Sequence, residues 1–174
     1  GTEVTLNKSQ CELRKKLVDK IAERGFDAVV EEVAYTWFNR LLAIRLMEVN
    51  DYLPSRVRVL SSETSGKREP DLVTAPFDTD LEFTEAEQEK IMKLKDDASS
   101  AASDALFRML FIKQCNKLHE ILPELFEETL DYTELLLNIS FTDPDGIVSH
   151  LINDIAEDDF DISRQGENGE AAGQ

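Results

Sequence analysis

Apolar residues recur along the chain at intervals of three and four positions, the spacing of one face of an α-helix. The first such series contains Leu6, Leu13, Leu17 and Ile21. Charged residues lie between its members, which is typical of an amphipathic helix. Asn7 and Gln10 have the spacing of a capping box, and Gly25 is a common kind of helix stop. The pattern predicts a first helix that ends at Gly25.

A second helix is predicted from about Asp27 to Glu48, and it is more apolar than the first. Its main stripe contains Val30, Val33, Trp37, Leu41 and Ile44. The apolar residues that widen this stripe are Ala34, Phe38, Leu42 and Met47. A helix that is apolar over more than half of its circumference usually lies at the centre of a fold. We therefore expect residues 26–48 to form the core of a helical bundle.

The segment 52–75 lacks helical periodicity. Pro54 and Pro70 interrupt it, and the run SSETSG is typical of a loop. The alternating string RVRVL (56–60) predicts either a short strand or an extended segment that lies over the helices.

Helical patterns return in the second half of the chain. Thr84 and Glu87 form a second capping-box pattern, which predicts a helix to about Asp96. The run DDASSAAS indicates a linker or a broken turn. Further helices are predicted at 103–119, at 121–137 with Pro123 in the first turn, and from Asp143–Pro144 onward. After Phe160 the composition predicts disorder. The expected organisation is thus a mainly α domain at 1–160 and a disordered acidic tail at 161–174.

Charge is unevenly distributed along the chain, whose formal net charge is −17. Residues 1–68 contain 12 Lys or Arg and 10 Asp or Glu, whereas residues 69–174 contain 7 and 26. An acidic body repels phosphate, so strong general binding of nucleic acid is not expected. A surface that meets a polyanion is expected only within the first 68 residues.

The cysteine content favours a reducing compartment. Cys11 and Cys115 both lie in helical patterns, and two buried free thiols are the expected state, with one disulfide as the alternative. No stretch approaches the roughly 18 apolar residues that span a bilayer. We therefore expect a cytoplasmic location and no membrane partner.

Few residues of the chain are candidates for catalysis, cofactor binding or metal binding. The glycines form no cofactor cradle, and the spacing of acids and lysines does not fit a nuclease. Asp78 and Asp80 could hold a cation, but solvated loop acids are the simpler interpretation. Cys115 and His119 are helical neighbours, yet their apolar surroundings favour a buried, unreactive thiol. We predict no catalytic, cofactor-binding or metal-binding residue in this chain.

Two basic features are candidate contacts to DNA or to a partner. Lys16, Lys20 and Arg24 form a ridge at four-residue spacing on the first helix. Arg56 and Arg58 alternate in the extended segment, which would place both on one face where they could clamp phosphates. The alternative is that the ridge is solvated and that the arginines pair with Glu63 or with acids of the second half.

One long segment carries a more specific signal. The string RGFDAVVEEVAYTWFNRLLAIRLMEVNDYLPSRVRVLSSE (24–63) closely resembles the N-terminal region of the adenine-specific DNA methyltransferases called PglX, from bacterial phage-exclusion (BREX) systems. The resemblance continues through EPDLV (69–73), FIKQCNKLHEILPELFE (111–127) and DYTELLLN (131–138). It therefore covers most of residues 12–160, and related stretches occur in fused restriction–modification proteins.

This resemblance implies a function for the parent protein rather than for any residue here. Members of the family transfer a methyl group from S-adenosylmethionine to the exocyclic amine of adenine. Their cofactor and catalytic motifs lie downstream of this region, so no catalytic residue carries over. The resemblance implies a non-catalytic helical domain that serves assembly, with weak contact to duplex DNA as a further role. The implied partners are the downstream methyltransferase domain and other subunits of the defence system.

Two other hypotheses remain open at this stage. The chain could be a free-standing acidic interaction module that imitates the charge of DNA, which predicts a closed polar surface. It could also be a small metal-dependent nuclease, which requires carboxylates converging near residues 78–80. The methyltransferase hypothesis instead predicts apolar surface left exposed where the rest of the enzyme packs.

Overall fold

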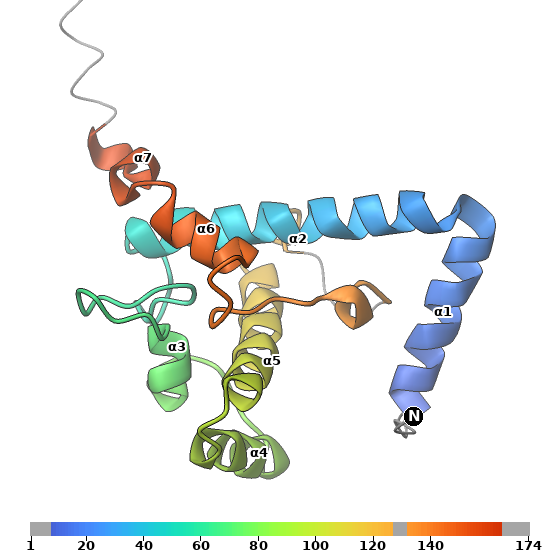
Figure 1. Cartoon of the computed structure of the whole chain (residues 1–174), viewed down its shortest axis with the longest axis horizontal. Coiled ribbons are helices and arrows are strands. Elements are labelled where there is room, and N and C mark those ends of the chain that lie inside the picture. The colour runs from blue at the N-terminus through green and yellow to red at the C-terminus, as the bar shows by residue number, and fades with distance from the viewer. Residues whose placement is uncertain (1–7, 127–131, 165–174) are drawn as a thin grey trace, which may run out of the picture. The chain divides into compact units, whose positions relative to one another are not determined.

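The computed structural model describes residues 8–126 and 132–164, and the regular structure within these ranges is helical, without a β-strand (Figure 1). This confirms the predicted mainly α class. The chain divides into two compact units, unit 1 with residues 1–40 and 115–138 and unit 2 with residues 41–114 and 139–174. Helices α2 and α5 contribute residues to both. The predicted cap at Asn7 and most of the predicted tail lie outside the described residues.

Unit 1 begins with α1 (Lys8–Arg24), which meets α2 (Phe26–Val49) at a sharp corner (Figure 1). Gly25 forms this corner with a φ of 89°, a left-handed backbone conformation that residues other than glycine rarely adopt. Its N–H donates to the Ile21 carbonyl at 2.8 Å and so completes the last turn of α1. The predicted helix stop is confirmed, as is the second helix.

The apolar stripe of α2 differs from its predicted position at one residue in unit 1. Val29, Val33 and Trp37 are buried, and the Trp37 indole N–H donates to the carbonyl of Thr133 in η2 (Tyr132–Leu136) at 3.1 Å. The predicted core residue Val30 is 40% exposed. The prediction that α2 is central throughout is therefore wrong for this unit, because only one narrow face of the helix packs here.

The predicted helix at 121–137 is also wrong in its described parts. Residues 121–126 form turns, and residues 132–136 form the 3-10 helix η2. Phe126 is fully buried, and the His119 ring nitrogen Nδ1 lies 2.6 Å from its carbonyl oxygen. This contact turns the chain back against the end of α5, so a straight helix after Pro123 would lose both the burial and the hydrogen bond. Residues 127–131 lie outside the described ranges.

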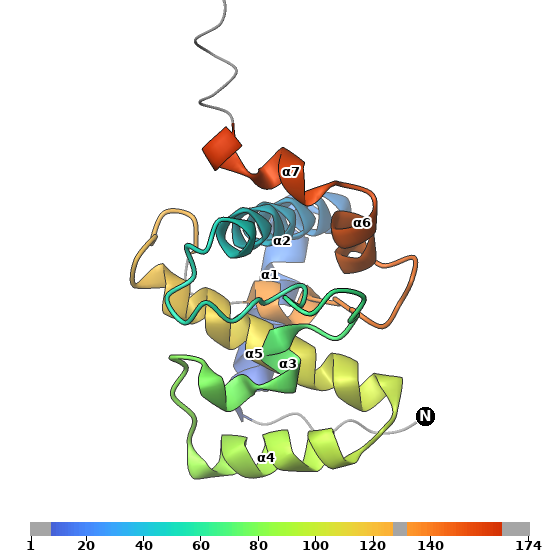
Figure 2. The same ribbon diagram turned by 90° about the vertical axis from the view of Figure 1, so that its left-hand side faces the viewer.

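Two antiparallel helices, α4 (Glu85–Asp96) and α5 (Ser100–His119), form one side of unit 2 (Figure 2). Thr84 and Glu87 form the predicted capping box, with backbone-to-side-chain distances of 2.8 and 3.2 Å. The Lys113 ammonium group binds the Glu87 carboxylate at 2.8 Å and joins the two helices. The predicted linker shortens to residues 97–99, because α5 begins three residues before the expected Ser103.

The core of unit 2 forms around α5, with short helices α3 (Asp71–Thr74) and η1 (Pro76–Asp78) nearby. Phe107 is fully buried and packs edge-to-face against Phe141, with ring centroids 5.5 Å apart. Asp104 then anchors the chain beside Phe141. Its carboxylate accepts hydrogen bonds from the backbone N–H groups of Phe141 and Thr142 at 3.1 and 3.2 Å. Its oxygens therefore satisfy backbone donors that have no strand partner.

The chain then continues through α6 (Ile147–Asn153), α7 (Glu157–Phe160) and η3 (Ile162–Arg164). The predicted helix start at Asp143–Pro144 is wrong by three residues. Those residues form a turn instead, in which the Gly146 N–H donates to the Asp143 carbonyl at 3.2 Å.

Candidate functional site

A buried ion pair lies at the end of α2 in unit 2. The Arg45 and Glu48 side chains are only 1% and 0% exposed, and Nη1 of Arg45 lies 2.8 Å from Oε1 of Glu48. The second carboxylate oxygen accepts the N–H groups of Val59 and Leu60 at 2.8 and 2.9 Å. Ser61 completes the shell, because its hydroxyl donates to Oε1 at 3.0 Å. Glu48 thus provides the hydrogen-bond acceptors that a neighbouring strand would otherwise supply.

Glu157 on α7 extends this network to a second arginine. Its Oε1 accepts from Arg45 Nη2 at 3.1 Å and from Arg58 Nη1 at 2.6 Å. Burial alone would raise the pKa of Glu157, but the hydrogen bond and charge of Arg58, with the charge of Arg45, lower it overall. Burial likewise acts to lower the pKa of Arg58, and the hydrogen bond and charge of Glu157 raise it overall. The two groups therefore hold each other in the charged state.

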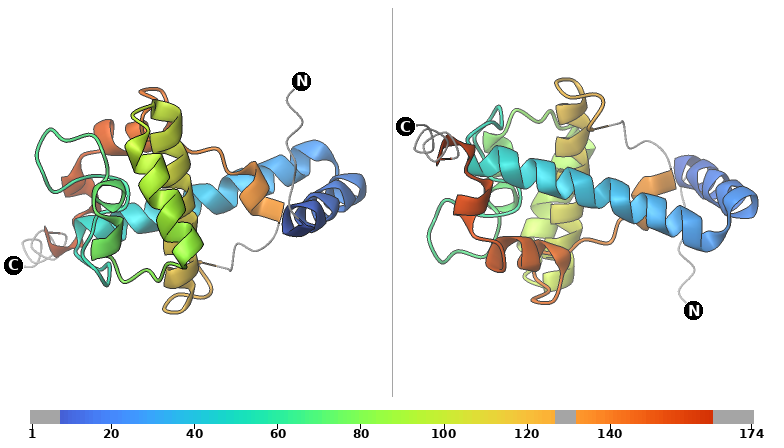
Figure 3. Two further views of the ribbon diagram at one scale, coloured as in Figure 1. Left: turned by 90° about the horizontal axis from the view of Figure 1, so that it is seen from below. Right: turned by 90° about the horizontal axis from the view of Figure 1, so that it is seen from above.

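Residues 157–162, which we call the C-terminal strap, are fixed to the end of α2 by further contacts. The Asn50 amide donates to the Phe160 carbonyl at 2.8 Å and accepts the Ile162 N–H at 3.1 Å. The Arg45 guanidinium lies 5.7 Å from the centroid of the Phe160 ring. Figure 3 shows α7 beside this end of α2. The strap therefore closes over the buried ion pair.

An open cavity of about 860 Å³ lies beside this network in unit 2. One wall is the loop 60–68 and another is α6. The charged residues that line it are Asp51, Arg58, Glu63, Lys67, Arg68 and Glu157. Because three of these are acidic and three are basic, the lining does not strongly select a ligand by the sign of its charge.

The two arginines predicted to share one face do not act as a pair. Arg56 has a φ of 57°, which breaks the alternation of an extended chain, and its exposed side chain makes no ion pair within the described ranges. Arg58 is mostly buried and binds Glu157 and the Ser61 hydroxyl. The predicted alternation of the two arginines is therefore not formed, and the alternative of pairing with an acid of the second half is confirmed for Arg58. Contact of either arginine with DNA stays a prediction.

The predicted ridge on α1 is exposed but partly neutralised. Lys20 binds Glu23 at 3.2 Å, and Arg24 forms an ion pair with Glu32. Lys16 is exposed and has no ion-pair partner among the described residues. Contact of this ridge with DNA stays a prediction.

The two cysteines differ in exposure. Cys115 is fully buried, and burial raises the pKa of its thiol to about 12, although the charge of Arg40 acts in the opposite direction. This confirms the predicted unreactive thiol. Cys11 is exposed, so the prediction that both thiols are buried is wrong for it.

The described residues contain no group of three or more His, Cys, Asp or Glu side chains placed to hold a metal ion. Among the same residues, no helix is long and apolar enough to cross a membrane.

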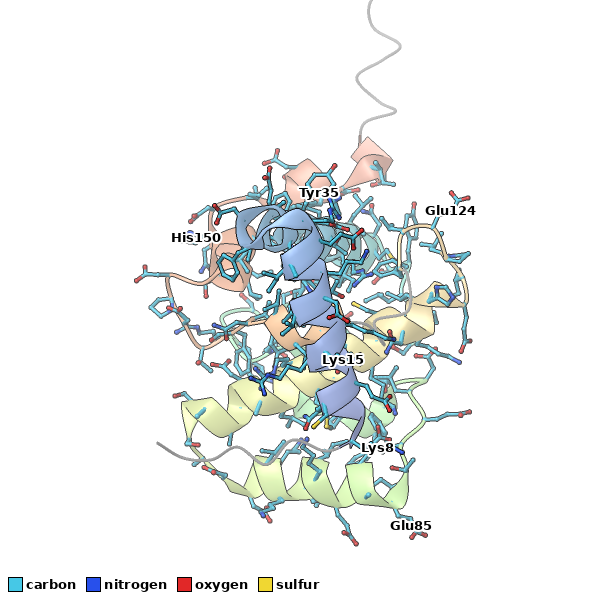
Figure 4. The ribbon with its side chains drawn as sticks, turned by 90° about the vertical axis from the view of Figure 1, so that its right-hand side faces the viewer. Lys8, Lys15, Tyr35, Glu85, Glu124 and His150 are labelled. Carbon is cyan, nitrogen blue, oxygen red and sulfur yellow. The ribbon has the colours of Figure 1, made fainter. Side chains whose placement is uncertain are left out.

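A row of exposed apolar side chains runs along the first half of α2 in unit 1. Phe26, Val30 and Phe38 are 61%, 40% and 42% exposed, and Ala34 between them is also exposed. We call these four residues the apolar row. Tyr35 is 69% exposed on the same helix, and Figure 4 labels it together with Lys8 and Lys15 of α1. Large apolar side chains gathered on one helix face are typical of a surface that packs against another chain or domain.

Glu48 and Glu157 were not among the residues predicted from the sequence. A signal existed for Glu48, because Leu41, Arg45 and Glu48 continue the apolar stripe at helical spacing and so place charges on a buried face. No local signal marks Glu157, which lies 99 residues from Arg58.

Comparison with known proteins gives a consistent set of relatives. The chain is 46% identical to the adenine-specific methyltransferase PglX of Lacticaseibacillus casei (strain Zhang) over 142 residues, which are 80% of this chain and 12% of that protein. It is 39% identical to the adenine-specific methyltransferase BrxX of Escherichia coli O9:H4 (strain HS) over 149 residues, which are 85% of this chain and 12% of that protein. No family model matches the chain. The chain thus spans about an eighth of the length of these relatives.

Proposed function

Since the chain belongs to the family of the adenine-specific methyltransferases PglX and BrxX and matches one segment of them, we propose that it is a non-catalytic helical segment. In this proposal it assembles with the rest of such an enzyme. In this proposal the segment is N-terminal, as the sequence resemblance implies. Its role is to present a folded surface against which the remainder of the protein packs.

The chemistry of the parent enzyme belongs to its other parts. The parent transfers a methyl group from S-adenosylmethionine to the exocyclic amine of adenine in DNA, and it acts in bacterial phage defence. The residues that bind S-adenosylmethionine and adenine lie in the downstream methyltransferase domain, which is the first partner of this segment. Other subunits of the defence system are further candidate partners.

The apolar row on α2 carries this proposal. Burial of apolar surface contributes roughly 25 cal/mol per Å², so two phenylalanines and a valine left in water represent a substantial unused driving force. The hypothesis of a free-standing interaction module predicts a closed polar surface. The exposed side chains of Phe26 and Phe38 argue against that hypothesis. A surface that meets the rest of a large enzyme accounts for the same exposure directly.

A chimera tests the proposal. The matching 142 residues of the full-length Lacticaseibacillus casei protein would be replaced by this chain. We expect the chimera to methylate adenine in DNA, measured by mass spectrometry. We also expect it to unfold in a calorimeter with the same transitions as the native relative, because an assembled segment unfolds together with the domain it packs on.

The chimera with Phe26→Ser and Phe38→Ser is the decisive variant. We expect the segment to unfold in a separate, earlier transition, with reduced methylation, because the apolar contact is lost. The matched control is Met92→Ser, which removes an apolar side chain that is 53% exposed from α4 in unit 2. Unchanged unfolding and methylation in the double variant would contradict assembly through α2.

A further inference from the structure

The geometry of the apolar row identifies the kind of partner that fits it. Phe26, Val30, Ala34 and Phe38 follow one another at intervals of four residues, so their side chains form a continuous ridge along α2. Ridges of this spacing interlock with the corresponding grooves of a second helix, which then crosses at roughly −50°. A helix is therefore the element that matches this surface.

A second row runs beside the first and adds charge. Asp27, Glu31 and Tyr35 are also spaced by four residues, and each is displaced by one position from a member of the apolar row. Both carboxylates are exposed, and neither has an ion-pair partner within the described residues. The neighbouring Glu32, in contrast, is paired with Arg24. The apolar row thus has an acidic border, which we define as Asp27 and Glu31.

We propose that this surface binds an amphipathic helix that carries Lys or Arg residues along one edge of its apolar face. The apolar face of that helix covers Phe26, Val30 and Phe38, and its basic edge lies against Asp27 and Glu31. Tyr35 lies in the acidic row, where its rigid ring adds apolar contact and its hydroxyl can form a hydrogen bond. Charge complementarity of this kind selects the partner and sets its direction along α2.

The occupant, which rests on the proposed function, is a helix from the part of the methyltransferase outside this chain. The chain spans 12% of the length of its relatives, so most of such an enzyme is available to supply that helix. A second copy that packed antiparallel through the same face would bring the acidic borders together, and like charges in contact are unfavourable. Residues 165–174 contain two glutamates and only two small apolar residues, so their composition does not match the row.

Binding of two synthetic peptides to this chain tests the charge rule. Both peptides are 18-residue helices with leucines along one face, flanked by lysines in one peptide and by glutamates in the other. We expect the lysine peptide to bind at least ten times more tightly, measured by fluorescence anisotropy at low salt. The variant with Asp27→Lys and Glu31→Lys should reverse this preference. Circular dichroism checks that each variant retains its helices.

Two matched variants separate the specific surface from general attraction to an acidic protein. Phe38→Ser should weaken the lysine peptide about tenfold, whereas charge reversal at Glu85 and Glu89 on α4 should leave its binding nearly unchanged. Equal binding of both peptides, or loss of binding with the α4 variant, would overturn the proposal. A dimer in analytical ultracentrifugation that Phe38→Ser dissolves would overturn it in favour of a second copy.

This experiment is independent of the chimera. If the chimera fails while the peptide preference follows the α2 charges, the docking surface stands and serves a partner other than the methyltransferase. If the chimera succeeds while both peptides bind equally, assembly stands and the proposed chemistry of the partner helix is wrong.

Discussion

Arg45 and Glu48 lie one turn apart on α2, and both side chains are withdrawn from solvent while they form an ion pair at 2.8 Å. Removal of two charges from water costs several kcal/mol for each ion, and this cost is offset only when further hydrogen bonds satisfy the pair. Here the backbone of Val59 and Leu60, the Ser61 hydroxyl and Glu157 supply those bonds. The pair therefore joins α2, the loop 58–62 and the strap into one network.

Removal of Glu48 alone should be more damaging than removal of Arg45 and Glu48 together. We expect Glu48→Ala to reduce the free energy of unfolding by about 3–5 kcal/mol, because Arg45 would lose its buried counter-charge and two backbone N–H groups would be left without an acceptor. Urea unfolding followed by circular dichroism measures this loss. The double variant with Arg45→Met and Glu48→Met should recover part of it, and Glu89→Ala on the exposed face of α4 should change stability by less than about 0.5 kcal/mol. A loss that small at Glu48 would contradict the role of the network.

The strap should make stability depend on pH through Glu157. The folded-state pKa of Glu157 lies below its ordinary value of 4.5, so its contribution is present at pH values above the unfolded pKa. That contribution is lost as the pH falls through the lowered folded pKa. We expect Glu157→Gln to lower the urea midpoint at pH 7 and the difference from the parent chain to shrink towards pH 3. Glu89→Gln is the control, and a constant difference across this range would contradict the assignment.

The parts of the fold that follow from local chemistry were predictable. The capping box of Thr84 and Glu87 lies within four residues, and the stop at Gly25 depends on its own φ angle. The predictions failed where distant contacts decide. Periodicity gave most of the stripe of α2 but not its first member, since Val29 rather than Val30 is buried.

The candidate sites show the same difference between features set by local chemistry and features set by distant contacts. A short string such as RVRVL suggests alternation, but it does not reveal that Arg56 turns into a left-handed conformation. Nor does it reveal that Arg58 meets a carboxylate 99 residues later. The exposed apolar row was expected in kind from the resemblance, because a segment of a larger enzyme must pack on something. Its position required the structure, since the same residues also fit a fully buried helix.

The two thiols should react at very different rates. Cys115 is fully buried and the pKa of its thiol is raised to about 12, so almost no reactive thiolate is present near neutral pH. We expect one thiol per chain to react rapidly with a disulfide reagent under native conditions and a second to react only on unfolding. In Cys11→Ser the rapid phase should disappear. Rapid labelling in that variant would show that Cys115 is accessible and that the packing around α5 is looser than described.

Contact with DNA, where it occurs in the first 68 residues, should depend on Arg56 rather than on Arg58. Arg56 is exposed and has no ion-pair partner within the described ranges, whereas Arg58 forms an ion pair with Glu157. In a titration of a labelled duplex of about 25 base pairs, we expect weak binding at low salt that falls steeply as salt is added, because phosphate contacts release counterions. Arg56→Ala should weaken this binding without a change in the urea midpoint. Arg58→Ala should lower the urea midpoint and leave the affinity for DNA nearly unchanged.

If the chain binds no DNA even at low salt, the contact hypothesis fails and assembly remains as the role of the segment. If Arg58→Ala weakens binding as strongly as Arg56→Ala does, the ion pair with Glu157 must open on DNA, and the strap becomes part of the DNA-binding surface.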